Sequence, residues 1–258
     1  MITSISVVYR FAAMQSKIKV SVIIPTLNEA DFIGTLVEFL TTNADSRLEK
    51  VIVCDGGSVD GTAELARDAG AEVVENLEQS RAVQMNAGWK VAGGNVLYFV
   101  HADSLPPKTY LDDIEEELKK GSDLGCYRFL FNSRRPALRF NSFMTRFNAL
   151  SFRGGDQTLF VKREVFEELN GYDESYEIME EYDFLIRANK RFKFSIIPKD
   201  VKVSARKYEY NSYFRVNVAN IVAFTMFRLN CSASSIKRVY FKMLRHPKDN
   251  NKFDQKEK

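Results

Sequence analysis

The feature of this sequence that most constrains its fold is a regular alternation, between Lys19 and Asp103, of short apolar runs with segments of helical spacing. The apolar runs are rich in β-branched residues and predict strands at 20–25, 50–55, 71–75 and 95–100. The segments between them, 30–40, 61–70 and 81–93, place apolar residues at helical intervals. This βαβαβαβ order predicts an α/β fold with a mostly parallel sheet flanked by helices, in which ligands bind beyond the carboxyl ends of the strands.

The size and composition of the chain are those of a globular protein. With 258 residues, 45% of them hydrophobic, it can bury a full core. We expect a single domain at 18–230, an extension at 1–17, and a basic C-terminal helix and tail at 231–258. The formal charge of +3 is too small to predict a nucleic-acid partner. Three widely spaced cysteines favour neither a disulfide framework nor a zinc site, and indicate a reducing compartment.

Neither end of the chain predicts a membrane-spanning helix. The N-terminal apolar stretch is short and interrupted by Arg10, which makes a poor signal peptide, and Met14 is a second candidate start. The apolar run 216–227 is too short to cross a bilayer. We therefore expect a cytoplasmic protein. Peripheral contact with the inner face of the membrane stays open, because 132–152 and 213–229 mix basic and apolar residues at helical spacing, although packing against the domain explains that spacing as well.

Three polar clusters follow the first, second and fourth predicted strands: PTLNE at 25–29, DGGSVDGT at 55–62 and HADS at 101–104. Each alone is ordinary turn or capping chemistry. Parallel strands bring all three to one edge of the sheet, which favours a binding site there. The absence of GxGxxG and GxxxxGK[ST] motifs argues against a Rossmann dinucleotide site and a P-loop. An edge with three aspartates suits a nucleotide whose phosphates are bridged by a hard divalent cation.

These clusters belong to an ordered series: P-T-L-N-E, D-G-G-S-x-D-G-T, R-x-x-Q-M-N-x-G and H-A-D-S-x-P, continued by GGDQTLFVKREVFEELNGYDE, IMEEYDFLIR and VSARKY. The series resembles the inverting family 2 glycosyltransferases with the GT-A fold, over roughly residues 18 to 240. It is most similar to the subgroup that has H-A-D where other members have D-x-D. The resemblance implies transfer of a sugar, with inversion, from a UDP- or GDP-linked donor to an acceptor hydroxyl, with a divalent cation.

The resemblance also implies which residues hold the donor. Asp103 would ligate Mn²⁺ or Mg²⁺ at the diphosphate, and Asp55 would accept hydrogen bonds from the base. His101 replaces a carboxylate, so contact with the ribose, contact with the metal and simple packing all stay open for it. The residues implied to line the donor site are Pro25, Asn28, Glu29, Asp55, Gly56, Arg81, Asn86, His101, Ala102, Asp103, Asp156, Gln157 and Arg206.

The segment 176–191 is where the resemblance implies a general base, which removes the proton of the acceptor hydroxyl. The family motif here is Glu-Asp, whose second member is the usual base, and this chain has Glu180 followed by Glu181. Glu181 is therefore the predicted base, with Glu180 and Asp183 as alternatives. The i,i+4 spacing of Asp183 and Arg187 also predicts a salt bridge on a helix surface, which would account for both residues without catalysis.

Two other functions stay open. A nucleotidyltransferase would use a carboxylate-bound metal on a similar sheet, but it would attack phosphorus and release pyrophosphate. A catalytically inert nucleotide-binding sensor or scaffold would explain the altered H-A-D and Glu-Glu positions. The sequence does not select the sugar, the nucleotide base or the acceptor, for which a lipid-linked molecule is one possibility.

Overall fold

The first half of the chain folds as its alternation predicts. The computed structural model describes residues 17–153 and 157–245. The elements before Asp103 are β1 (Val20–Thr26), α2 (Ala30–Thr42), β2 (Leu48–Asp55), α3 (Thr62–Asp68), β3 (Glu72–Val74), α4 (Arg81–Val91) and β4 (Val96–Phe99). The four strands lie in the order β3-β2-β1-β4, and all three pairings are parallel. The three polar clusters therefore follow strand ends at the same edge.

The second half of the sheet contains the antiparallel pairings for which a mostly parallel sheet leaves room. Its elements are β5 (Ser104–Leu105), α5 (Tyr110–Lys119), β6 (Leu124–Phe131), α6 (Pro136–Met144), η1 (Leu150–Phe152), β7 (Leu159–Lys162), α7 (Arg163–Glu168), α8 (Glu180–Ala188), β8 (Phe194–Val203), α9 (Lys207–Tyr210), α10 (Tyr213–Arg228) and α11 (Ala233–Met243). The order continues as β7-β6-β8-β5, with β7 antiparallel to both β4 and β6, and β5 antiparallel to β8. Only β6 and β8 pair in parallel there. The sheet is thus mixed, because β7 returns to β4 from far along the chain and needs no crossover helix.

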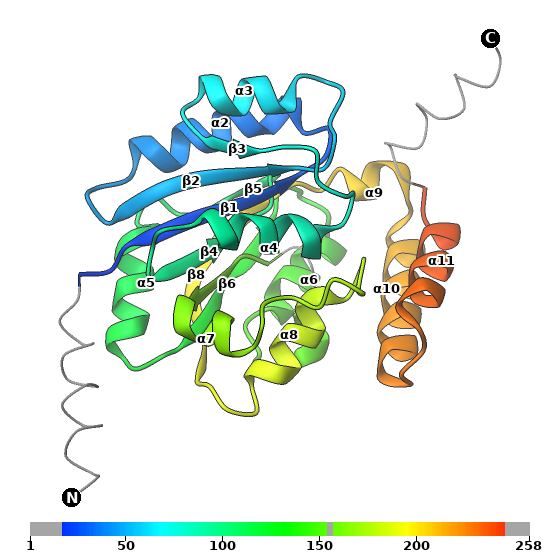
Figure 1. Cartoon of the computed structure of the whole chain (residues 1–258). Helices are drawn as coiled ribbons and strands as arrows, with labels where there is room; N and C mark the ends of the chain where they lie inside the picture. Colours follow the sequence, from blue (N-terminus) through cyan, green and yellow to red (C-terminus); the bar gives the residue numbers. More distant parts are fainter. Residues whose placement is uncertain (1–16, 154–156, 246–258) are drawn as a thin grey trace, which may run out of the picture.

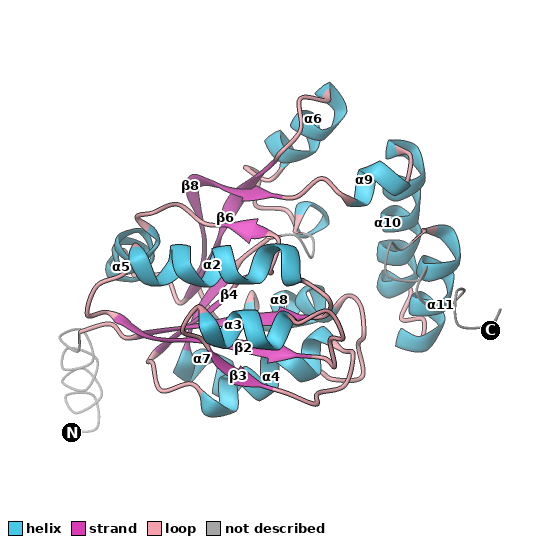
Figure 2. Ribbon diagram, turned by 90° about the horizontal axis from the view of Figure 1, so that it is seen from above, coloured by secondary structure: helices cyan, strands magenta, loops and turns pink. Residues whose placement is uncertain are grey.

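Helices cover both faces of the sheet, and each face has its own core (Figure 1). The alternation of β1 shows the division, since Val22 and Ile24 belong to one cluster and Ile23 to the other. The first cluster includes the buried apolar residues of α2 and α5, and the second those of α4, α7 and α8. Figure 2 looks down on the face covered by α2 and α3. The loops at the strand ends are consequently held between two rigid layers.

The helices α10 and α11 form a hairpin beside the sheet domain (Figures 1 and 2). The expected C-terminal helices are therefore present, and α10 continues beyond the apolar run. In the described part of the chain, no helix combines the length and hydropathy needed to span a membrane. Residues 1–16 and 246–258, which include most of the expected extension and the end of the expected tail, lie outside the described residues.

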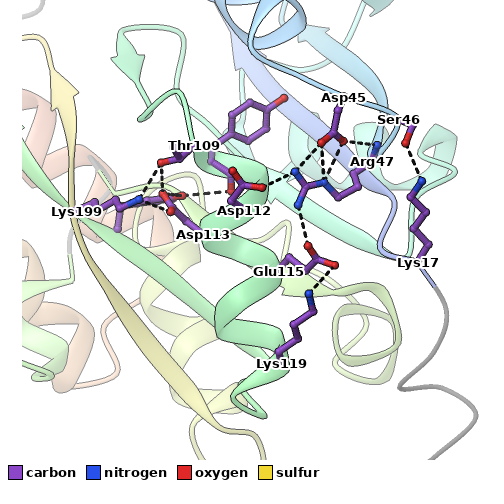
Figure 3. A network of polar contacts seen from close by, with 12 residues as sticks. Lys17, Asp45, Ser46, Arg47, Thr109, Asp112, Asp113, Glu115, Lys119 and Lys199 are labelled. Carbon is purple, nitrogen blue, oxygen red and sulfur yellow. Dashed lines mark hydrogen bonds and ion pairs between the residues drawn. The ribbon is translucent and has the colours of Figure 1, made fainter.

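A cluster of ion pairs fastens α5 to the amino end of β2 (Figure 3). Arg47 contacts three carboxylates, those of Asp45 at 2.6 Å, Asp112 at 2.5 Å and Glu115 at 2.8 Å. This cluster lies at the start of a parallel strand, at the opposite end from the polar loops. The role of this charge cluster is therefore structural.

Candidate active site

The loop after β2 is built around the Asp55 carboxylate. Oδ1 accepts hydrogen bonds from Thr26 Oγ1 at 3.2 Å and Ser58 Oγ at 2.5 Å. Oδ2 accepts from the backbone N–H groups of Gly57 at 2.9 Å and Ser58 at 2.8 Å. Asp55 is 3% exposed. Its carboxylate thus shapes the turn, and the contact with a nucleotide base that the resemblance implies stays a prediction.

The loops after β1 and β2 are joined to each other by side-chain hydrogen bonds. The N–H of Asn28 donates to Ser58 Oγ at 2.7 Å, and Asn28 Oδ1 accepts from Val59 at 3.0 Å. Asn28 has a φ of 52°, in the left-handed region that asparagine tolerates better than most residues. The N–H of Glu29 donates to Thr62 Oγ1 at 2.8 Å. The two loops therefore form one preorganised rim.

Gly56 and Gln84 explain why the rim packs so closely on the sheet. Gln84 Nε2 donates to the carbonyl oxygens of Thr26 at 2.6 Å and Cys54 at 3.1 Å, which ties the ends of β1 and β2 together. A Cβ atom at Gly56 would lie 2.6 Å from this nitrogen. Gln84 was part of a quoted motif but received no role from the sequence. Its role depends on the pairing of two strands, which no local pattern reveals.

Asp103, Arg206 and Glu29 meet beyond the end of β4. Arg206 Nη2 lies 2.6 Å from Glu29 Oε1 and 3.5 Å from Asp103 Oδ2. The side chains of Asp103 and Arg206 are 23% and 28% exposed, so both are accessible from solvent. Burial alone would lower the pKa of Arg206, but the hydrogen bond that Arg206 donates to the Glu29 carboxylate raises it. A predicted metal ligand and a cationic residue predicted for the donor site are thus neighbours, although they are distant in sequence.

His101 and Glu181 form the second polar contact at this edge. His101 Nε2 lies 3.2 Å from Glu181 Oε1, and the side chain of each is 14% exposed. Burial alone would lower the pKa of His101, but the hydrogen bond and charge of Glu181 hold it above its usual value. The structure therefore gives His101 a contact that the sequence did not suggest, with the predicted base itself.

Glu180 differs sharply from its neighbour. Its side chain is 1% exposed, and its Oε1 lies 2.9 Å from Arg81 Nε. Burial raises the pKa of Glu180, and the charge of Arg81 opposes this only in part. Asp183 takes a third position on α8, where its Oδ2 contacts Arg187 Nη2 at 2.7 Å, and this confirms the expected i,i+4 salt bridge. Of the three candidate carboxylates, Glu181 is the one in contact with His101.

The backbone conformation just before α8 sets the positions of Glu180 and Glu181. Met179, the residue before the first helical turn, has a φ of 74°. A side chain with a Cβ atom pays roughly 1 kcal/mol for this left-handed conformation, so the surrounding structure must hold it there. Asn86 contributes to that support, because its Nδ2 donates to the Tyr172 carbonyl oxygen at 2.9 Å and to Glu174 Oε1 at 2.8 Å. Asn86 is 4% exposed, so its amide positions the segment that leads to α8.

A small cavity of about 20 Å³ adjoins Glu181 on the side of β6 and β7. Gln157, at 7% exposure, lines it and accepts a hydrogen bond from Arg153 Nη1 at 3.2 Å through Oε1. Arg153 is buried and also donates to the carbonyl oxygen of Thr145 at 3.2 Å. Sequence reasoning missed Arg153, since nothing in its local pattern marks a buried cation. Asp156 lies outside the described residues, whereas Pro25 and Ala102 are buried beside the rim.

Comparison with known proteins shows which family the chain resembles. Residues 21–167 match the family model described as Glycosyl transferase family 2. The glycosyltransferase AglE of Haloferax volcanii is 30% identical over 168 residues, which cover 59% of this chain and 55% of that protein. The chain spans about half the length of the curated relatives it matches.

Two solved structures show the same fold. One is the mannosyltransferase PcManGT from Pyrobaculum calidifontis in complex with GDP-Man and Mn²⁺, with a TM-score of 0.62 and 19% identity over 88% of this chain and 69% of that chain. The other is glucosyl-3-phosphoglycerate synthase from Mycobacterium tuberculosis in complex with Mn²⁺, UDP-glucose and phosphoglyceric acid, with a TM-score of 0.60 and 16% identity over 85% of this chain and 82% of that chain. The likeness confirms a GT-A-like arrangement of sheet and helices.

Proposed function

Because the chain belongs to glycosyl transferase family 2, we propose that it transfers a sugar from a UDP- or GDP-linked donor to an acceptor hydroxyl, with inversion at the anomeric carbon. One observation carries the proposal. Two polar contacts each include a residue that comes just after β4. Asp103 lies 3.5 Å from Arg206, and His101 lies 3.2 Å from Glu181. A site for a departing diphosphate and a candidate base therefore share one edge of the sheet.

The residues fit a divalent cation that arrives with the donor. Among residues 17–153 and 157–245, no cluster of three or more His, Cys, Asp or Glu side chains could hold a metal ion by itself. Mg²⁺ is commonly held by one or two carboxylates together with substrate phosphates, and Asp103 supplies one such carboxylate. Asp103 would hold Mn²⁺ or Mg²⁺, which would neutralise charge on the diphosphate as it leaves. Arg206 would add a second positive charge beside it.

Glu181 would act as the general base. The acceptor oxygen would form a bond to the anomeric carbon while the bond to the diphosphate oxygen breaks, and the acceptor proton would pass to the Glu181 carboxylate. His101 would position that carboxylate by its contact at 3.2 Å. A single displacement of this kind inverts the anomeric centre and needs one base. Glu180 would stay buried as the partner of Arg81, and Asp183 as the partner of Arg187.

The test is product analysis with a panel of UDP- and GDP-linked sugars in the presence of Mn²⁺. Release of nucleoside diphosphate above the rate in buffer supports the proposal. Release of pyrophosphate would instead identify a nucleotidyltransferase. Binding of nucleotides without turnover of any donor would identify a sensor or scaffold. A thermal-shift screen with the same panel selects the donor, because a ligand that binds only the native state raises its apparent stability.

The acceptor and its location form the less specific part of the proposal. We propose a lipid-linked acceptor, reached from a cytoplasmic position at the membrane surface. The support is the mixture of basic and apolar residues in 132–152 and 213–229, both of which contain exposed aromatic side chains. Extraction of cells into soluble and membrane fractions, followed by a salt wash, tests the location.

A further inference from the structure

The helix α10 has two apolar sides, and only one of them packs against the domain. Its buried side consists of Val216, Ala219, Ala223 and Phe227. On the outer side, Phe214, Val218 and Ile221 are 79%, 48% and 64% exposed. Their spacing of four and three residues places them on one face of the helix. A water-soluble surface helix normally carries polar residues on such a face, so this one calls for an occupant.

The helix α6 and the turn after it present a second apolar group next to α10. Phe140, Phe143 and Phe147 are 60%, 48% and 48% exposed. Asn141 Nδ2 donates to Asn217 Oδ1 at 3.2 Å, so the two helices are in direct contact. We call these exposed apolar residues, together with the exposed Arg139, Arg146 and Arg228 beside them, the apolar–basic face.

The charge of this region differs from that of the whole chain. Residues 132–152 and 207–245 contain eleven Lys or Arg and a single acidic residue, Glu209. The whole chain has a formal charge of only +3, so the remainder is net negative. Arg139 of α6, Arg146 of the turn after it and Arg228 of α10 are exposed. Long basic side chains beside exposed aromatic residues are what a protein presents to the headgroups and upper acyl chains of an anionic bilayer.

We infer that the apolar–basic face docks on an anionic lipid surface. A second copy of the chain is a poor occupant, since a symmetric dimer would bring two faces of the same positive charge together. An anionic bilayer offers both an apolar layer for the aromatic residues and negative headgroups for the arginines. The described helices do not span a membrane, which is consistent with helices that lie in the interface plane.

The face is tied to the candidate active site through α8. Tyr182, the residue after Glu181, packs against Phe224 of α10 with ring centroids 5.3 Å apart. Docking would therefore hold the helix of the candidate base next to the membrane, where a lipid-linked acceptor presents its hydroxyl. The inference deepens the proposed membrane contact but does not depend on sugar transfer, because it concerns binding alone.

The test is flotation of the full chain with vesicles of phosphatidylcholine, with and without phosphatidylglycerol. We expect binding to the mixed vesicles and much weaker binding to the neutral ones. The double variant Phe214→Ser/Ile221→Ser removes apolar contacts and should lower the vesicle-bound fraction at least tenfold, given about 0.8 kcal/mol for each buried methylene group. The double variant Arg139→Gln/Arg228→Gln should weaken binding roughly fivefold for each charge removed.

Matched controls lie on other helices. Leu65 of α3 is 42% exposed, and Lys119 and Lys120 are exposed at the C-terminal end of α5. The variants Leu65→Ser and Lys119→Gln/Lys120→Gln should bind mixed vesicles like the parent protein, and all variants should unfold at nearly the same temperature.

Equal binding to neutral and anionic vesicles would overturn the inference, as would full binding by both double variants. A parent dimer that Phe214→Ser/Ile221→Ser turns into a monomer, without vesicle binding, would assign the face to a second copy instead. Donor turnover measured in the absence of lipid tests the proposed function separately.

Discussion

Charged side chains cluster at both ends of the sheet, but the carboxylates are exposed at one end and buried at the other. At the amino end of β2, Arg47 meets three carboxylates, and the side chains of Asp45 and Asp112 are 51% and 66% exposed. At the carboxyl end of β4, Arg81 meets Glu180, whose side chain is 1% exposed. The hydrogen bond from Arg47 lowers the pKa of Asp45 to about 2, whereas burial raises the pKa of Glu180.

The difference teaches how burial changes the behaviour of clustered charge in this molecule. Carboxylates that remain in contact with water, such as Asp45, stay ionised at neutral pH and add little to stability. A buried carboxylate such as Glu180 has its pKa raised by the loss of solvation, and the charge of Arg81 opposes this only in part. The residue types at the two ends are the same, so burial and position distinguish them.

The largest difference between the two ends is expected at Glu181. The variant Glu181→Gln keeps the size of the side chain but removes its basicity, so transfer should fall by roughly 10²-fold or more with donor affinity little changed. The same substitution at the other end, Glu115→Gln, should leave turnover unaltered. Steady-state release of nucleoside diphosphate measures both. Normal turnover by Glu181→Gln, with loss in Glu180→Gln or Asp183→Asn at unchanged thermal stability, would move the base to that residue.

Asp103 tests whether the carboxyl end holds the metal. The variant Asp103→Asn should weaken Mn²⁺-dependent binding of nucleoside diphosphate about 30-fold, since a contact with a charged group contributes about 2 kcal/mol. Binding of the nucleoside alone should change little. Titration calorimetry with both ligands gives the comparison. Equal weakening of the two would point to damage of the nucleotide pocket rather than loss of a metal ligand.

The two arginines sharpen the comparison through stability. Arg81→Gln leaves Glu180 buried without its charge partner and should lower the free energy of unfolding by about 2 kcal/mol. Adding Glu180→Gln to it should restore most of that loss. Arg47→Gln removes pairs whose carboxylates remain in contact with water, and it should lower the free energy of unfolding by about 1 kcal/mol. Urea unfolding of the three variants provides the values, and a greater loss for Arg47→Gln than for Arg81→Gln would reverse the ranking of the two ends.

The smallest effects concern pH, and the two ends should respond with opposite sign. Asp45 has a lowered pKa, so its contribution is present above its usual value of 3.8 and is lost as the pH falls through about 2. Asp45→Asn should therefore cost about 0.5 kcal/mol near neutrality and nothing in strong acid. Glu180 has a raised pKa, so the native state loses stability as the pH rises above 4.5. The variant Glu180→Gln should therefore become more stable relative to the parent protein as the pH rises above 4.5. If the stability of both variants relative to the parent changed with pH in the same direction, the contrast between the two ends would be contradicted.

The sequence predicted those parts of the fold that depend on neighbouring residues. The strands and helices before Asp103 lie within a few residues of their expected bounds, because apolar periodicity and glycine stops are local signals. The salt bridge between Asp183 and Arg187 was predicted for the same reason. The antiparallel return of β7 to β4 was missed, since a strand's own pattern does not state which strand it pairs with or in which direction.

The candidate site shows the same limit. Each motif was visible, but the contacts between motifs were not, because His101 and Glu181 are 80 positions apart and Glu29 and Arg206 are 177 positions apart. Arg153 was missed because its burial is produced by residues from several elements. Periodicity therefore identifies elements, whereas the partnerships that create a site emerge only when the chain is folded.

The uneven charge of the apolar–basic face has a further consequence. With basic residues gathered on α6, α10 and α11 and a net negative remainder, the molecule has an electric dipole moment that points through these helices. In the field of a negatively charged surface such a dipole feels a torque, which turns the positive side toward the surface before the two touch. The field decays over about 8 Å at physiological ionic strength, so this rotation is completed only in the last layer of solvent. Added salt would consequently randomise the orientation of approach, even where the contacts that form afterwards are apolar.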